Sequence, residues 1–294
     1  MYLVVGATGQ LGGEICRLLT AQGKPVRGLV RATSDQAKVD ELKSYGVETV
    51  QGDICDPASL EAACQGVNAV ISTASSMPFC YEAGVNDIQH VDLDGTTCLI
   101  DAAQAAGVER FIYTSFTPDN DFPLRNAKRA VEGHLKDSGL VYTILRPSYF
   151  MEGWLGPAVG FDYPNAKAQI YGAGENPISW ISFQDVARFA VESLDNPSAR
   201  NATLELGGPE ALSPLAVVRI FEEVGGRPFD VQHVPEEALA EQQKSATDPM
   251  QQSFAGLMRW YAKGDSIDMG ETLQTFPVQL MSVRDYAQSV LTTS

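Results

Sequence analysis

Short apolar runs alternate with longer amphipathic segments through the first half of the chain. The runs lie at residues 2–5, 25–30, 47–51, 69–72, 110–114 and 141–145, and helical patterns lie between several of them at 35–44, 86–106 and 124–138. Runs that are apolar at nearly every position, such as 69–71, are typical of strands covered on both faces. The pattern therefore predicts an α/β fold with a doubly wound parallel sheet.

The alternation loosens after residue 147, where glycine, proline and aromatic residues crowd positions 149–164. We expect one domain at residues 1–150 and a smaller α+β portion at 151–294, some segments of which return to the first sheet. The later elements are expected to be strands at 168–171 and 203–206, a helix at 183–194, and helices from Pro214 and from about Pro249.

Three glycines follow the first predicted strand, in the sequence Gly6-Ala-Thr-Gly9-Gln-Leu-Gly12. Gly6 can adopt the positive φ of a tight turn, Gly9 lets a phosphate approach bare backbone, and Gly12 lets a helix pack closely on the strands. The unpaired amides of the first helical turn then face an anion. A glycine-rich turn without a ligand is the alternative, but the strand before it and the helix after it favour a dinucleotide site. Its predicted contacts are Gly6, Thr8, Gly9, Gln10, Leu11 and Gly12.

Arg31 directly follows the second predicted strand. An acidic residue at this place binds the adenine ribose 2′-hydroxyl and favours NAD, whereas an arginine accommodates the 2′-phosphate of NADP. A guanidinium can also pair with a phosphate in a planar fork. We therefore expect NADP(H) to be preferred over NAD(H). A solvated surface arginine is the alternative interpretation.

Two further segments are expected to line the dinucleotide. Asp53 and Ile54 follow the third strand, where a carboxylate can accept a hydrogen bond from the adenine amine; a turn or helix-cap aspartate is the alternative. Small residues close the fourth strand and leave room for the cofactor to cross the sheet edge, namely Thr73, Ala74 and Ser75. Asp35 and Asp56, which stand just before predicted helices, are interpreted as helix caps.

Charge and composition exclude several classes of protein. The net charge of −16 and a pI near 4.5 oppose binding to nucleic acid or anionic lipid. The five cysteines are widely spaced and suit reduced thiols, and the three histidines form no zinc pattern, so we expect no metal. No apolar run approaches the about 20 residues of a membrane helix. We expect a cytoplasmic protein, monomeric or homodimeric, without a direct nucleic-acid or membrane partner.

Several motifs together resemble the NmrA-like family of atypical short-chain dehydrogenases/reductases over nearly the whole chain. They are the glycine motif, Val30-Arg31, Gly52-Asp53, Lys128 with Val131-Glu132, and the segments 91–96, 111–115, 143–147 and 178–187. The resemblance implies NAD(P) binding, often of NADPH, on a Rossmann domain. It also implies that Thr114, Lys128, Pro147, Tyr149 and Phe150 lie beside the cofactor.

The usual proton donor of short-chain dehydrogenases is missing from this chain. In that wider family a tyrosine four residues before a lysine supplies the proton, and a nearby serine orients the carbonyl. Here Lys128 takes the lysine position and Ser115 corresponds to the serine, but Leu124 stands in the tyrosine position. The catalytic candidates are Lys128, Ser115 and Tyr149, with Tyr113 as a further proton donor. A surface role on its helix is the alternative for Lys128.

Apolar and aromatic residues predict a pocket for a flat acceptor, lined by Met77, Phe79, Tyr81, Phe150 and Trp154. Simple packing of these aromatic side chains between the two portions of the chain is the alternative. An acceptor that needs little proton donation, such as a quinone or a cationic dye, fits the missing tyrosine better than a simple carbonyl compound.

Two functions of different classes follow. The first is an NAD(P)H-dependent oxidoreductase of the quinone reductase type, which transfers hydride from NADPH to a small aromatic or quinone-like acceptor without the usual tyrosine acid. The alternative is a non-catalytic NADP(H)-sensing regulator of the NmrA type, which would act on a protein partner. An epimerase or dehydratase is less favoured, because those reactions also use the missing tyrosine.

Overall fold

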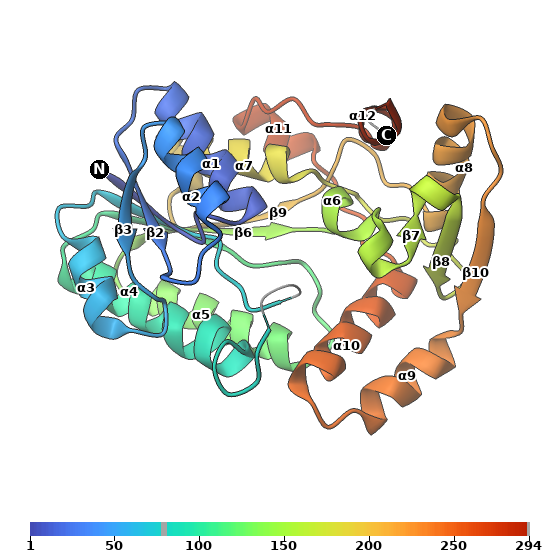
Figure 1. Ribbon diagram of the computed structural model, residues 1–294, viewed down its shortest axis with the longest axis horizontal. Coiled ribbons are helices and arrows are strands. Elements are labelled where there is room, and N and C mark those ends of the chain that lie inside the picture. Colours follow the sequence, from blue (N-terminus) through green and yellow to red (C-terminus); the bar gives the residue numbers. More distant parts are fainter. Residues whose placement is uncertain (78–80, 293–294) are drawn as a thin grey trace. The chain divides into compact units, whose positions relative to one another are not determined.

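A computed structural model describes residues 1–77 and 81–292 of the chain. The strands of its larger sheet are β1 (Tyr2–Val5), β2 (Val26–Val30), β3 (Glu48–Gln51), β4 (Ala69–Ser72), β5 (Arg110–Thr114), β6 (Val141–Pro147) and β9 (Ala202–Leu206). They follow the order β3-β2-β1-β4-β5-β6-β9, and neighbouring strands from β3 to β6 are parallel (Figure 1). The strand order reverses between β1 and β4, which is where sheets of this kind bind ligands beyond their carboxyl ends.

Helices cover both faces of this sheet, which confirms the predicted doubly wound fold. They are α1 (Gln10–Ala21), α2 (Gln36–Ser44), α3 (Pro57–Cys64), α4 (Thr96–Ala105), α5 (Pro123–Asp137) and α7 (Phe183–Glu192). In Figure 1, α1 and α2 lie on one face, and α3, α4 and α5 lie on the other. The helices are held by apolar stripes that the sheet buries, with Leu60 of α3, Leu99 of α4 and Val131 of α5 all fully buried in one cluster.

Local sequence signals explain how several helices begin. The Asp35 carboxylate accepts a hydrogen bond from the Ala37 amide at the start of α2, and Asp56 accepts one from Ala58 at the start of α3. Both predicted caps are therefore confirmed. The segment expected to be one helix at 86–106 is different, because it opens as a π-helix, Ile88–Gly95, and becomes α-helical only from Thr96.

Contacts along the chain group it into two units. The first consists of residues 1–115, 126–146 and 186–204, and the second of residues 116–125, 147–185 and 205–294. Residues 186–204 thus belong with the larger sheet although they lie far beyond residue 150. Among the described residues, no helix has the length and apolar character that crossing a bilayer requires.

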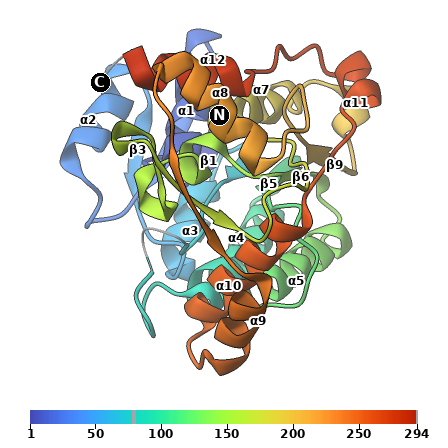
Figure 2. The ribbon, with the colours of Figure 1, turned by 90° about the vertical axis from the view of Figure 1, so that its right-hand side faces the viewer.

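The second unit is built around a smaller sheet of order β10-β8-β7, in which β8 pairs with β10 in parallel and with β7 in antiparallel fashion. Its elements are α6 (Met151–Trp154), β7 (Phe161–Asp162), β8 (Lys167–Tyr171), α8 (Pro214–Gly225), β10 (Asp230–Val234), α9 (Glu236–Ser245), α10 (Pro249–Lys263), α11 (Gly270–Thr275) and α12 (Val283–Thr292). Short 3₁₀ turns occur at Pro157–Val159 and Tyr163–Asn165, and in the first unit at Pro197–Ala199. Figure 2 shows α8 beside α12 and α9 beside α10.

Candidate functional site

The turn between β1 and α1 has the geometry that its glycines predict. Gly6 has a φ of +86°, and its carbonyl oxygen accepts a hydrogen bond of 2.9 Å from the Gly9 amide. A Cβ atom at Gly12 would lie 2.2 Å from that same oxygen and 3.0 Å from the Thr73 hydroxyl. Side chains cannot occupy such space, so Gly12 permits α1 to begin directly against the turn and the end of β4.

The start of α1 fits an anionic group. Its N-cap is Gly9, which has no side chain with which to bond the first-turn amides. Gly9 and Gln10 are exposed, whereas Leu11 and Gly12 are buried. The first-turn amides, which have no partner within the helix, and the positive end of the helix dipole thus lie directly after β1, an arrangement that suits a dinucleotide pyrophosphate.

Arg31 stands at the end of β2, as predicted, and is half-buried. Its Nη1 donates a hydrogen bond of 3.2 Å to Oδ1 of Asn86, and its backbone amide donates to the Ser34 hydroxyl. Among the described residues, Arg31 joins no ion pair. No carboxylate of the described residues therefore pairs with its guanidinium at the end of β2, where an adenosine 2′-phosphate is expected.

Asp53 and Ile54 follow β3, but their side chains have structural partners. The Asp53 carboxylate accepts a hydrogen bond of 2.9 Å from the Cys55 amide, as a turn aspartate does, and Ile54 is 7% exposed. The interpretation of Asp53 as a turn residue thus has direct support. Contact of either residue with adenine stays a prediction.

The strands β4 and β5 end in small polar residues at the predicted cofactor edge. The amide and hydroxyl of Thr73 both bond the Val5 carbonyl, which joins this segment to the glycine turn. The buried hydroxyls of Ser72 and Thr114 lack a hydrogen-bond partner within the described part of the chain. Buried polar groups are rarely left in this state, so a bound group at this edge would account for them. Ala74 and Ser75 are partly buried beside them.

Lys128 is buried and paired with a carboxylate, so it is not a surface lysine. Its side chain belongs to α5 and is about 5% exposed, and its Nζ lies 3.3 Å from Oδ1 of the fully buried Asp92. The other oxygen of Asp92 accepts hydrogen bonds from the hydroxyl and the amide of Ser76, at 2.6 and 3.0 Å. This pair connects α5 to the segment that leaves β4. Lys128 Nζ also lies 5.4 Å from the ring centre of Tyr113.

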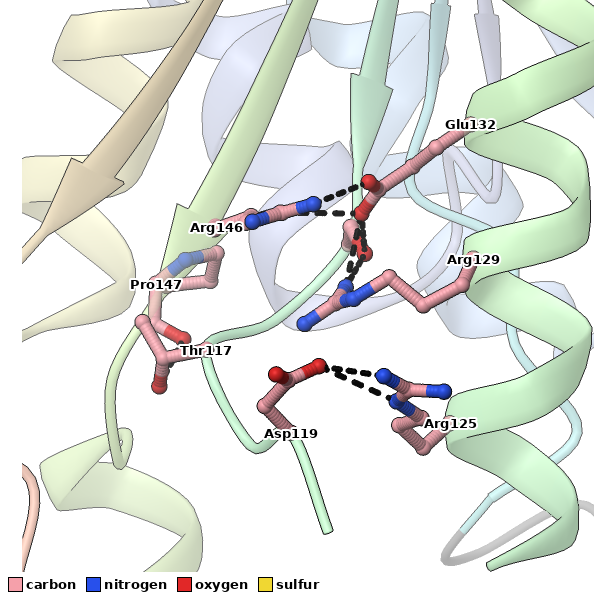
Figure 3. A network of polar contacts seen from close by, with 8 residues as sticks. Thr117, Asp119, Arg125, Arg129, Glu132, Arg146 and Pro147 are labelled. Atoms are coloured by element: carbon pink, nitrogen blue, oxygen red, sulfur yellow. Dashed lines mark hydrogen bonds and ion pairs between the residues drawn. The ribbon is translucent and has the colours of Figure 1, made fainter. Parts of the chain in front are cut away.

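Ser115 belongs to a second buried network, of which Arg129, Glu132 and Arg146 are labelled in Figure 3. The Ser115 hydroxyl donates to Oε1 of Glu132 at 2.6 Å and accepts from Nη1 of Arg129 at 3.1 Å. Arg129 and Arg146 both form ion pairs with the same Glu132 carboxylate. Burial raises the pKa of Glu132, but the hydrogen bonds from Arg146 and Ser115 and the two positive charges outweigh this and hold it below its ordinary value.

Sequence reasoning did not place Glu132 in this network. A signal was present, because Glu132 lies one helical turn after Lys128, so both side chains leave the same face of α5. Arg146 is the last residue but one of strand β6, and only the sheet brings it to Glu132.

Tyr113 is the other predicted proton donor in the first unit. Its hydroxyl is buried and has no hydrogen-bond partner among the described residues. Burial, followed by the charges of Asp92 and Glu132, raises the pKa of Tyr113 well above its ordinary value. Tyr113 is therefore a very weak acid at neutral pH.

The remaining predicted residues of this kind belong to the second unit, where they pack into an aromatic cluster. The Tyr149 hydroxyl donates a 2.7 Å hydrogen bond to the Leu257 carbonyl, and its ring meets Trp154 edge-on at 4.8 Å. Burial raises the pKa of Tyr149 well above its ordinary value. The ring of Phe150 lies 4.1 Å from that of Phe183. Tyr149 and Trp154 thus pack within the second unit, and their place beside a cofactor or a flat acceptor stays a prediction.

The structure also describes most of the other predicted pocket residues, together with Leu124, which stands in the position of the missing tyrosine. Met77 and Tyr81 are half-buried, and Phe79 lies outside the described residues. Pro147 is buried and its carbonyl accepts from the Thr117 amide. Leu124 is 4% exposed, and its amide bonds the Ser253 hydroxyl. In the described ranges, no group of three or more histidine, cysteine, aspartate or glutamate side chains is arranged to hold a metal ion.

Comparison with known proteins agrees with this architecture. The model of the NmrA-like family matches residues 2–287. An NAD(P)H azoreductase of Xenophilus azovorans is 33% identical over 232 residues, 78% of this chain and 75% of the relative. The photosystem II assembly factor Ycf39 of Synechocystis is 31% identical over 277 residues, 92% of this chain and 79% of the relative. The crystal structure of an NADPH-dependent quinone oxidoreductase from Escherichia coli with NADPH has a TM-score of 0.75 at 25% identity, covering 99% of both chains. The chain therefore belongs to the NmrA-like family.

Proposed function

We propose that this protein is an NADPH-dependent reductase that delivers hydride to a flat, conjugated acceptor such as a quinone. The observation that carries the proposal is the pairing of an intact dinucleotide cradle with a buried Lys128 and a leucine at position 124. The azoreductase and the quinone oxidoreductase named above support it, because both names describe reduction of conjugated acceptors.

The residues of the first unit are suited to hold NADPH. The first-turn amides of α1 would bind the pyrophosphate, and the guanidinium of Arg31, which joins no ion pair with a described residue, would bind the 2′-phosphate. Lys128 would hold the nicotinamide ribose, and its ion pair with Asp92 keeps the ammonium group in place. When bound, NADPH supplies a hydride from its nicotinamide ring.

The proposed acceptor class follows from the weakness of the candidate proton donors. Tyr113 and Tyr149 both have a pKa raised well above the ordinary value of tyrosine, and the Tyr149 hydroxyl is already bonded to a backbone carbonyl. An alkoxide formed from a simple ketone needs a proton as the hydride arrives. A reduced quinone is a stabilised anion, which can take its proton from water afterwards.

Steady-state kinetics with matched lysine variants tests the proposal. NADPH oxidation would be followed with quinones, azo dyes and simple ketones as acceptors. We expect turnover with the conjugated acceptors, and a loss of at least about 100-fold in kcat/KM in Lys128→Met. Lys136→Met is the control, because Lys136 lies exposed in the last turn of the same helix. Absence of turnover with every acceptor, or an unchanged Lys128→Met enzyme, would refute the proposal.

A second candidate function is a sensor that binds NADP(H) and acts on a protein partner without turnover. Leu124 in the tyrosine position and the relationship to a photosystem II assembly factor favour it. The sensor requires a protein whose association state or partner binding differs between NADP⁺ and NADPH. Sedimentation of the protein with each nucleotide distinguishes the two functions, because the reductase needs no such difference.

A further inference from the structure

Three carboxylates that lie close in sequence to Arg31 or Asn86, or directly after β3, have hydrogen-bond partners of their own. Asp35 bonds the Ala37 amide at the start of α2, and Asp53 bonds the Cys55 amide. Asp87 accepts hydrogen bonds from the amides of His90 and Gly84, at 2.9 and 2.8 Å. Asp35 and Asp53 thus bind backbone N–H groups, and Asp87 Oδ1 also lies 2.8 Å from Nδ1 of the His90 ring. Within the described part of the chain, the guanidinium of Arg31 has a neutral partner, the side-chain oxygen of Asn86.

Asn86 is held firmly by the backbone around it. Residues 82 and 86 form a two-way backbone bridge, with the Glu82 amide 2.9 Å from the Asn86 carbonyl and the Asn86 amide 2.8 Å from the Glu82 carbonyl. The next residue, Asp87, is the N-cap of the π-helix that begins at Ile88. The backbone of position 86 is thus fixed on both sides, and its side chain is half-buried. A substitution of equal size would keep the same place.

We propose that Asn86 is a specificity-determining residue, which orients the Arg31 guanidinium for a 2′-phosphate without neutralising its charge. The inference rests on the proposed binding of NADP(H). One donor of the guanidinium fork is occupied by Asn86, which fixes the plane of the group, and the rest of the fork stays available to an anion. An aspartate at position 86 would form an ion pair with Arg31 and would also repel the phosphate.

The expected effect of that exchange is large for so small a change. Asn86→Asp keeps the size of the side chain and places a carboxylate about 3 Å from the guanidinium. Removing the net charge of a half-buried anion site and adding a like charge beside it should weaken NADPH binding by roughly 10- to 100-fold. NADH has a 2′-hydroxyl in place of the phosphate, so its affinity should change by less than about threefold.

Titration calorimetry of the whole protein with NADPH and with NADH tests the inference without any need for turnover. The variants are Asn86→Asp, Arg31→Ala and their combination, with Asn68→Asp as control. Asn68 is exposed and directly precedes β4, so Asn68→Asp adds the same charge at the amino ends of the strands, away from Arg31. We expect Asn86→Asp to lower the ratio of NADPH to NADH affinity by at least tenfold, the double variant to bind NADPH no more tightly than Arg31→Ala, and Asn68→Asp to match the wild type.

Other outcomes have distinct meanings. If Asn86→Asp binds NADPH with unchanged preference while Arg31→Ala loses it, the role of Asn86 is refuted and the proposed function stands. If the wild type binds neither nucleotide, the proposed function and this inference both fail. Asn86→Ala guards against misfolding, because it removes the contact without adding charge. It should weaken NADPH binding by only about two- to fivefold, and a loss as large as that of Asn86→Asp would overturn the electrostatic argument.

Discussion

Gly12→Ala should damage both the stability of the first unit and its nucleotide cradle. The added Cβ would lie 2.2 Å from the Gly6 carbonyl oxygen, more than 1 Å inside the 3.4 Å at which ordinary contact begins. The oxygen belongs to backbone, so relief requires α1 or the turn to move. Overpacking of this kind costs about 1–3 kcal/mol. An alanine also gains up to about 1 kcal/mol over glycine within a helix, which partly hides that cost.

The adjacent Gly13→Ala is the matched control that removes this ambiguity. Gly13 lies in the same helix, but its Cβ would meet the Ala7 carbonyl oxygen at an ordinary 3.5 Å. Both variants gain the same helix propensity, so their difference in unfolding free energy isolates the steric cost of about 1–3 kcal/mol. At about 2–4 °C for each kcal/mol, Gly12→Ala should melt on the order of 5 °C below Gly13→Ala.

The second measurement is the affinity for NADPH. Moving the Gly6 carbonyl would shift the Gly9 amide that is bonded to it, and with it the start of α1. We expect Gly12→Ala to bind NADPH at least about tenfold more weakly, or 1.4 kcal/mol, and Gly13→Ala to stay within about twofold of the wild type. Equal melting temperatures and equal affinities in the two variants would refute the assignment of Gly12 to close packing beneath the cradle.

Three other predictions concern buried charges and a thiol. Asp92→Asn leaves Lys128 buried without its counter-charge and should lower the unfolding free energy by about 3–5 kcal/mol. The double variant Asp92→Asn/Lys128→Met should recover at least half of this loss. Urea unfolding measures both, and additive losses from the two substitutions would argue against the pair. Because the pKa of Glu132 is lowered in the folded state, its ion pairs stabilise the protein above about pH 5, and this contribution is lost as the pH falls through the lowered folded value. Melting from pH 7 to pH 3.5 should therefore show the wild type and Glu132→Gln converging in acid, and a constant gap would contradict the shift. Burial, together with the charge of Asp53, raises the pKa of the Cys55 thiol to about 11. At pH 7.5 iodoacetamide should therefore modify Cys55 on the order of 100-fold more slowly than an ordinary thiol. Peptide mass spectrometry after timed alkylation measures this rate, and labelling as fast as that of an ordinary thiol would contradict the prediction.

Local signals along the chain were sufficient to predict much of the first unit. Strands β4 and β5 have the predicted bounds, because a run of apolar residues at these places has no stable position except inside the sheet. Strand β10 was not predicted. Its residues are mostly polar and partly or fully exposed, so no apolar pattern distinguishes it from a loop, and it is a strand only because β8 offers it an edge.

The candidate site also has a part that the sequence could predict and a part that it could not. The glycine turn could be predicted from sequence because turn, phosphate cradle and helix start lie within a few consecutive residues, where backbone sterics act locally. The pairs Lys128–Asp92 and Arg146–Glu132 join residues of different elements. Arg31, which follows β2, contacts Asn86, which precedes the π-helix, only because the fold brings these two segments together. The burial of each charged group and the charge beside it depend on such neighbours, and no local run of residues specifies them until the helices have packed on the sheet.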